Sequence, residues 1–202
     1  MSLTNPYGDV ELSEPQAMRA LAHPARLAIL GHLQRFGPST ATRLSPHVGA
    51  TPSVVSWHLR HLATFGLVRD AASEGDGRER WWEAVGSGFR FVPPDDPADV
   101  ERETAYRALT DQMVARSVAQ ARRWLDEDEP RLPRRWRRLG GHANTRIEVT
   151  AAELEEIEKA IEGLLAPYVR RRDAEDAPRG ARPVRLLRFT MPEAAEAKRR
   201  RR

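Results

Sequence analysis

The stretch ATPSVVSWHLRHLATFGL, residues 50–67, decides the fold. Thr51 is a good helix N-cap, and Pro52 suits the first helical position because its missing N–H would have no partner there. Gly66 is a natural stop at the other end. The apolar residues between them are spaced by four and then three positions, which predicts a helix with one narrow apolar face. They are Val55, Leu59 and Leu62.

The opposite face of this predicted helix is polar. A short, capped helix with an apolar back and a front of serine, arginine and histidine has the features of a recognition helix that enters a DNA major groove. Taken alone, the pattern fits an ordinary amphipathic surface helix equally well. The polar face carries Ser53, Ser56, Trp57, Arg60 and Thr64, with His61 at its edge.

The preceding residues predict three further helices. A short helix follows Ser13, an amphipathic helix in 24–37 has core leucines, and residues 39–49 form a short helix whose end is set by Pro46 and Gly49. Two short helices joined by a tight, glycine-containing turn form a helix-turn-helix. The core leucines are Leu27, Leu30 and Leu33.

After Gly66 the hydrophobic period changes from 3.6 to 2, which predicts a β-hairpin, or wing. Its strands are residues 67–69 and 80–83, around a polar loop at 72–77. Arg78, just past the loop, is placed to reach a phosphate or a narrow minor groove. A solvated hairpin tip is the alternative interpretation.

Three runs together, LAHPARLAILGHL, TPSVVSWHLRHLATFGLV and GRERWW, resemble the winged helix-turn-helix of the ArsR family of bacterial transcription regulators. The resemblance covers about residues 14–92. It implies DNA contacts in the groove and, from Arg78, in the wing. Trp57 departs from the family pattern, which has His or another polar residue there, so its indole either contacts DNA or packs against the protein. The groove contacts implied are from Pro52, Ser53, Ser56, Trp57 and Arg60; we add His61 and Arg80 to the candidate DNA-binding residues.

The charge distribution shows that bulk charge does not carry a nucleic-acid function. The 202-residue chain has a net charge of +4, but residues 1–97 hold 9 Arg and 10 acidic residues, a net charge of −1. Histidines add positive charge to this half below about pH 6.5 if their pKa values are ordinary. These histidines are His23, His32, His47, His58 and His61.

Composition also excludes several classes of site. The chain has no cysteine, which excludes disulfides, thiolate metal sites and thiol nucleophiles. It shows no apolar run near the 18 residues of a membrane span and no signal-peptide pattern, so we expect a soluble, cytoplasmic protein without membrane partners. His58 and His61 are spaced to chelate zinc, but a metal there would block the DNA face, so we expect no metal site and no cofactor.

Residues 98–128 predict a long amphipathic helix of about 45 Å, more than the small domain can cover by itself. A second copy of the chain is the simplest cover, and winged-helix regulators bind two-fold sites as dimers. The alternative is a helix that folds back on the C-terminal part of its own chain.

The remaining segments are assigned by composition and spacing. Residues 1–13 are expected to be a flexible arm, 129–142 a Pro-, Arg- and Gly-rich connection, and 193–202 a disordered basic tail. Residues 143–192 predict a strand-helix-strand module, with strands at 145–149 and 184–191. Its helix is capped by Thr150 with Glu153 in a capping box. We expect this module to bind an effector or to help dimerisation.

The overall prediction is a mainly α fold with a small β component (α+β), built as a winged helix-turn-helix, a dimerisation helix and the C-terminal module. The function that fits best is a dimeric, sequence-specific DNA-binding regulator, a repressor that responds to a non-metal small-molecule effector. A winged helix that binds proteins instead of DNA is the alternative. A methyltransferase-type enzyme fits poorly because the chain has no G-x-G-x-x-G or Walker pattern.

Overall fold

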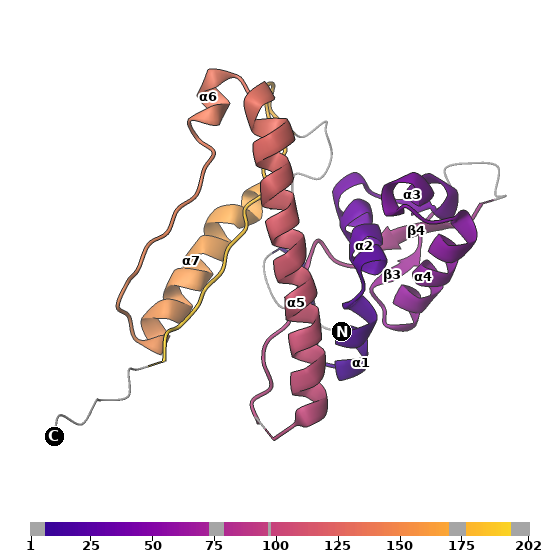
Figure 1. Ribbon diagram of the computed structural model, residues 1–202, viewed down its shortest axis with the longest axis horizontal. Coiled ribbons are helices and arrows are strands. Elements are labelled where there is room, and N and C mark those ends of the chain that lie inside the picture. Colours follow the sequence, from indigo (N-terminus) through magenta and orange to yellow (C-terminus); the bar gives the residue numbers. More distant parts are fainter. Residues whose placement is uncertain (1–6, 73–78, 97, 170–176, 195–202) are drawn as a thin grey trace.

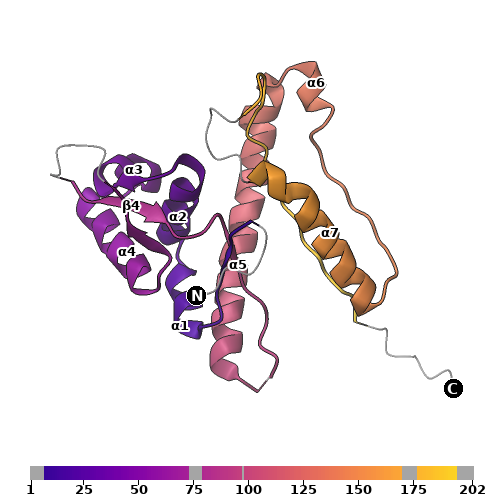
Figure 2. The ribbon, with the colours of Figure 1, turned by 180° about the vertical axis from the view of Figure 1, so that it is seen from behind.

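The computed structural model describes residues 7–72, 79–96, 98–169 and 177–194. It is mainly helical with a few short strands, which confirms the α+β class. The long helix α5 (Val100–Arg123) runs through the middle of the molecule. The N-terminal helices pack on one side of it, and the C-terminal helix α7 (Ala151–Val169) lies on the other (Figure 1; Figure 2).

Four helices and a small sheet form the N-terminal domain, in the order of a winged helix-turn-helix. The sheet has three antiparallel strands in the order β2-β4-β3. The helices are α1 (Pro15–Leu21), α2 (Pro24–Phe36), α3 (Ala41–Val48) and α4 (Pro52–Thr64), and the strands are β2 (Ser39–Thr40), β3 (Val68–Asp70) and β4 (Trp81–Ala84).

The start of α3 corrects the prediction of a helix that begins at residue 39. Ser39 and Thr40 pair with β4 instead. Thr40 has an extended backbone because it is the N-cap of α3, and its hydroxyl accepts a hydrogen bond from the Arg43 N–H at 3.3 Å. That extended backbone is what a strand pair requires. At the other end, α3 runs past Pro46 and ends at Gly49, which has a left-handed backbone with φ of 70°.

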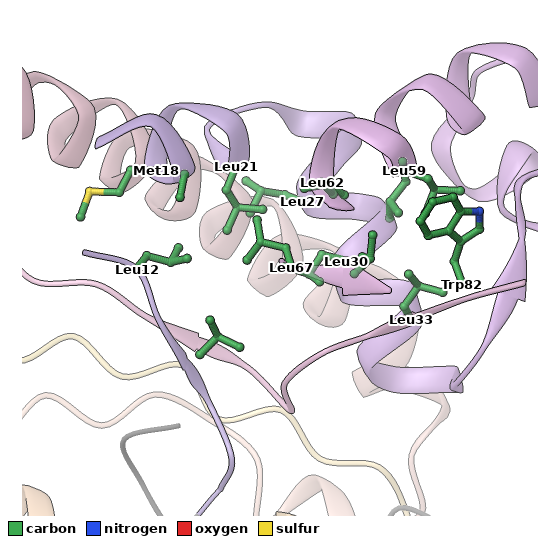
Figure 3. Packing of buried hydrophobic residues seen from close by; sticks show 14 of the residues in the cluster. Leu12, Met18, Leu21, Leu27, Leu30, Leu33, Leu59, Leu62, Leu67 and Trp82 are labelled. Atoms are coloured by element: carbon green, nitrogen blue, oxygen red, sulfur yellow. The ribbon is translucent and has the colours of Figure 1, made fainter. Parts of the chain in front are cut away.

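The core lies between α2, α4 and the sheet, where the predicted leucines are buried (Figure 3). Leu59 and Leu62 of α4 meet the leucines of α2, with Trp82 of β4 closing one end. Each fully buried leucine contributes about 1.5–3 kcal/mol through the hydrophobic effect. This packing fixes which side of α4 faces inward. The leucines of α2 are Leu27, Leu30 and Leu33.

The N-terminal segment corrects the prediction of a flexible arm over residues 1–13. Strand β1 (Val10–Glu11) pairs in parallel with β5 (Phe89–Arg90), and Val10 and Leu12 are 2% and 1% exposed. The Leu12 N–H also donates to the carbonyl oxygen of Arg90 at 2.8 Å. Two alternating apolar residues are too few to show a strand period in the sequence. Residues 1–6 of the predicted arm lie outside the described residues.

The predicted helix at 98–128 is confirmed. Helix α5 continues into one π-helical turn, Trp124–Asp128, and its 24 residues span roughly 36 Å. It extends beyond the N-terminal domain (Figure 1). The connection that follows contains a 3-10 turn, Glu129–Arg131, and the short helix α6 (Arg134–Arg137).

The C-terminal module is only partly as predicted. Helix α7 forms and Thr150 caps it, with the Thr150 N–H donating to the Glu153 carboxylate at 2.7 Å. The strands predicted at 145–149 and 184–191 are wrong, because both segments lack strand pairing. They run along different sides of α7, so neither has a neighbour to pair with (Figure 1; Figure 2). The predicted tail lies outside the described residues from 195 onward.

Candidate nucleic-acid interface

Helix α4 has one buried and one open side. Val55, Leu59 and Leu62 are fully buried, and His58 lies with them. The side chains predicted to contact DNA lie on the other side, where no other element of the described chain covers them. Pro52, Ser53, Trp57 and Arg60 are exposed, and Ser56 and His61 are half-buried.

The first turn of α4 is organised by its cap. The Thr51 hydroxyl accepts a hydrogen bond from the Val54 N–H at 3.5 Å, and Pro52 occupies the first helical position. The first backbone N–H groups of a helix have no partner within the helix. Such groups bind phosphate oxygens well because the helix dipole also favours an anion there. Ser53, in this turn, is exposed and adds a hydroxyl.

Trp57 combines the two roles that the sequence left open. Its ring stacks on His61, one helical turn along, with centroids 5.5 Å apart and planes only 6° from parallel. Arg26 of α2 lies near the same ring, with its guanidinium carbon 6.0 Å from the centroid. The side chain is nevertheless 53% exposed. The indole is therefore held by the protein and still offers an apolar surface to a partner.

Two histidines of α4, one beneath this surface and one at its edge, have lowered pKa values. His58 is buried, and its ring lies 4.9 Å from that of His23. Burial lowers the pKa of His58, and the nearby His23 and Arg26 lower it further. Burial and Arg26 lower the pKa of His61 as well. These two side chains therefore become charged only below the pH of about 6.5 expected for an ordinary histidine.

Two of the arginines in the hairpin are already paired. The Arg80 guanidinium donates two hydrogen bonds to the Asp70 carboxylate, one of them at 2.8 Å, and lies 4.2 Å from the ring centre of Trp82. The Arg80 hydrogen bond lowers the pKa of Asp70. Arg69 pairs with Glu83 at 2.6 Å. By contrast, within the described part of the chain no carboxylate is paired with Arg60. Arg78 lies outside the described residues.

The sequence did not indicate two residues that shape the surface between α3 and the hairpin. Arg43, in the first turn of α3, is exposed, and its guanidinium carbon lies 4.5 Å from the ring centre of Trp81. Glu79 accepts hydrogen bonds from the hydroxyls of Thr42 and Thr40, which lower its pKa. The hairpin is thus fixed to the start of α3. A basic residue three positions after a capping threonine was the available signal for Arg43.

Comparison with known proteins agrees with this geometry. A family model described as a helix-turn-helix domain matches residues 21–71, which include α2, α3 and α4. No curated protein matches the chain. Within the described ranges, no helix combines the length and apolarity needed to cross a membrane. The chain therefore contains a helix-turn-helix domain, the kind of domain that indicates a DNA-binding regulator.

Proposed function

We propose that the protein is a dimeric, sequence-specific DNA-binding transcription regulator of the ArsR type, a cytoplasmic repressor that a non-metal effector releases from DNA. In this proposal α4 enters the major groove and the β3-β4 hairpin lies against the backbone beside it. Base contacts come from Ser56, Trp57 and Arg60. The other proposed DNA-binding residues are Pro52, Ser53, His61, Arg78 and Arg80.

The observation that carries this proposal is the open outer side of α4. A helix of an isolated domain normally buries its apolar side and exposes a charged one. Here the exposed side combines hydroxyls, an indole and Arg60, which has no carboxylate partner in the described ranges. Arginine and serine are side chains that hydrogen-bond to base edges in the major groove. The exposed first turn of α4 adds backbone N–H groups for a phosphate.

A two-fold assembly is supported by α5. Val114, Val118 and Leu125 are 41%, 45% and 45% exposed. They are spaced by four and seven residues, which places them on one side of the helix. An apolar stripe on a helix that extends beyond its own domain is suited to a second copy of the same helix. Dimerisation would also set the spacing of two DNA half-sites.

The experiment is a binding measurement with the full-length protein. DNA sequences are first selected from a random pool, and their affinity is then compared with that of scrambled DNA by fluorescence anisotropy. We expect Arg60→Ala to weaken binding to the selected sequence by about 1–3 kcal/mol, roughly 5- to 150-fold, and binding to scrambled DNA much less. Arg135→Ala, an exposed arginine of α6, is the control and should leave both affinities unchanged. Equal losses on both DNAs would contradict base reading by Arg60.

A protein-binding winged helix is the second candidate. It is favoured by the ion pairs of Arg69 and Arg80, which leave the hairpin with less free positive charge. The same selection separates the two candidates. A pool that gains no preferred sequence and no affinity over successive rounds would favour the protein-binding function.

A further inference from the structure

The inward face of α5 changes character along its length. Ala105 and Leu109, four residues apart, are fully buried in the core. Arg116 and Arg123 follow Leu109 by seven and fourteen residues, so they lie on the same side of the helix. Arg116 is half-buried. A helix side that begins as core therefore continues as a cationic surface that still faces the rest of the protein.

A cavity opens at this point between α2 and α5. Its volume is about 260 Å³, and α2 supplies an apolar wall while α5 supplies an amide and a guanidinium. Gly31 of α2 makes room for that guanidinium, because a Cβ at this position would lie 2.8 Å from Nη2 of Arg116. The lining residues are Pro24, Leu27, Gln112, Ala115 and Arg116.

Among the described residues, the charges that act on Arg116 are of one sign. Burial lowers the pKa of Arg116, and the nearby Arg185 lowers it further. Arg185 belongs to the segment that runs beside the C-terminal half of α5 (Figure 2), and its own pKa is lowered by burial and by Arg35 and Arg123. Among the described residues only Arg123 of these four has a carboxylate partner, Glu127 at 3.7 Å. Arg116 is half-buried and has no carboxylate partner among the described residues, and a cation in this position is costly unless an anion joins it.

We propose that Arg116 and this cavity bind a small organic anion, a carboxylate or phosphate group carried on a compact apolar body. The guanidinium of arginine matches both anions because it can donate two parallel hydrogen bonds. The apolar body would lie against Pro24 and Leu27. A cavity of about 150 Å³ is known to hold benzene, so about 260 Å³ suits a group somewhat larger than one ring. A drug-sized molecule needs more space.

The site is also well positioned to bind an effector that controls DNA binding, a role that rests on the proposed function above. It is bordered by α2 of the DNA-binding domain, by α5 and, through Arg185, by the C-terminal segment. A ligand bound there contacts α2 through its apolar body and α5 through its charged group, and so favours one arrangement of the domain relative to α5. Through linkage, such a ligand changes DNA affinity and DNA changes the ligand's affinity by the same factor.

The test is isothermal titration calorimetry of the full-length protein at constant ionic strength, with benzoate, phenyl phosphate and the neutral analogue benzamide as probes. We expect at least one of the two anions to bind saturably, with one site per chain, and benzamide to bind at least tenfold more weakly. Which anion binds more tightly identifies the charged group. Equal binding of benzamide, or no saturable binding of either anion at millimolar concentration, would overturn the proposal.

Three variants connect the binding to the site. Arg116→Gln should weaken anion binding at least tenfold, and Arg116→Lys, which keeps the charge but loses the planar fork, should fall between this variant and the wild type. Arg122→Gln, on the same helix and exposed, should bind like the wild type. Anion binding that is the same in all four proteins would place the ligand elsewhere and overturn the proposal.

The outcome is distinct from that of the proposed function. If the protein selects no DNA sequence but binds an anion through Arg116, the regulator proposal fails and the anion site stands. If it binds DNA specifically while Arg116→Gln leaves anion binding unchanged, the regulator proposal stands and the anion site fails.

Discussion

Arg80 donates two hydrogen bonds to the carboxylate of Asp70, across the β3-β4 hairpin. Arg80 directly precedes β4, and Asp70 ends β3. The hairpin register places Asp70 opposite Trp82, and the Arg80 guanidinium lies over that ring. Neighbours within the hairpin therefore fix the position of this arginine and pair its charge. An incoming phosphate would have to compete with Asp70.

Replacement of Asp70 by asparagine should strengthen DNA binding. It removes one negative charge from the hairpin and frees Arg80 for a phosphate, so we expect a several-fold gain in affinity at low salt. The slope of log K against log salt should steepen by about 0.9, the value for one added phosphate contact. Fluorescence anisotropy across a salt series measures both. Glu103→Gln, which frees Arg107 on α5 in the same way, is the control and should change neither quantity.

Trp57 should affect binding more than folding. Because its side chain is about half exposed, Trp57→Ala should cost about 1 kcal/mol of unfolding free energy, well below the 3–5 kcal/mol typical of a core tryptophan. We expect the same change to weaken operator binding at least several-fold, and Trp57→Phe to retain part of the affinity because a smaller ring still stacks on His61. Urea denaturation and anisotropy give the two values. If Trp57→Ala binds the operator as tightly as the wild type, the indole only packs against the protein and does not contact DNA.

The two sides of α4 should differ sharply in stability measurements. Leu59 is fully buried, so Leu59→Ala should lower the unfolding free energy by about 2–5 kcal/mol. Val54, on the open side, is 44% exposed, and Val54→Ala should change it by no more than about 0.5 kcal/mol. Both changes in unfolding free energy are measured by urea denaturation. Similar losses in the two variants would mean that the outer side of α4 is covered in solution.

Stability should fall in mild acid because of His58. Its pKa is lowered in the folded protein, so between pH 7 and 5 the unfolded chain binds more protons than the folded one. The stability that the neutral His58 gives the folded protein is fully present above about pH 6.5. It is lost as the pH falls, and the unfolding free energy then decreases by at most about 1.4 kcal/mol per pH unit. His58→Gln should therefore flatten the dependence seen by urea denaturation at each pH. His142→Gln, at an exposed position, should keep the wild-type slope.

A charge on the apolar stripe of α5 should separate the proposed dimer. Val118→Arg places a guanidinium among Val114 and Leu125, where it would be buried without a partner against a second copy. Light scattering after size exclusion should then give the mass of a single chain at micromolar concentration. Ala119→Arg adds the same charge about 100° around the helix and should leave the dimer intact. A wild type that is monomeric, or a dimeric Val118→Arg, would contradict this use of α5.

Local signals allowed the sequence to predict much of the DNA-binding domain. Thr51, Pro52 and Gly66 act on their own segment of chain, so they place α4 correctly within two residues. The leucine spacing in the same region identifies the inner side. The alternation at 184–191 is also a genuine strand pattern, but a strand forms only where another strand accepts its hydrogen bonds.

Features that depend on distant parts of the chain were not predictable. The partner of Arg80 depends on the register between β3 and β4, and β1 depends on a segment about eighty residues away. The cationic surroundings of Arg116 arise from α2, α5 and the C-terminal segment together. The pattern of residues within one segment does not reveal contacts between distant segments, so this group of arginines is recognisable only in the folded structure.

The parallel pair of β1 and β5 has a practical consequence for work on this protein. The same region holds the C-terminal helix, because Arg90 of β5 forms an ion pair with Glu162 and the Tyr7 hydroxyl donates to the Ile161 carbonyl oxygen at 3.4 Å. Shortening the chain to begin after Leu12 would therefore remove an anchor of α7, more than 150 residues away along the sequence. Purification tags are better placed where they do not crowd Tyr7, because the hydrogen bond from Tyr7 to Ile161 helps to hold α7 in place.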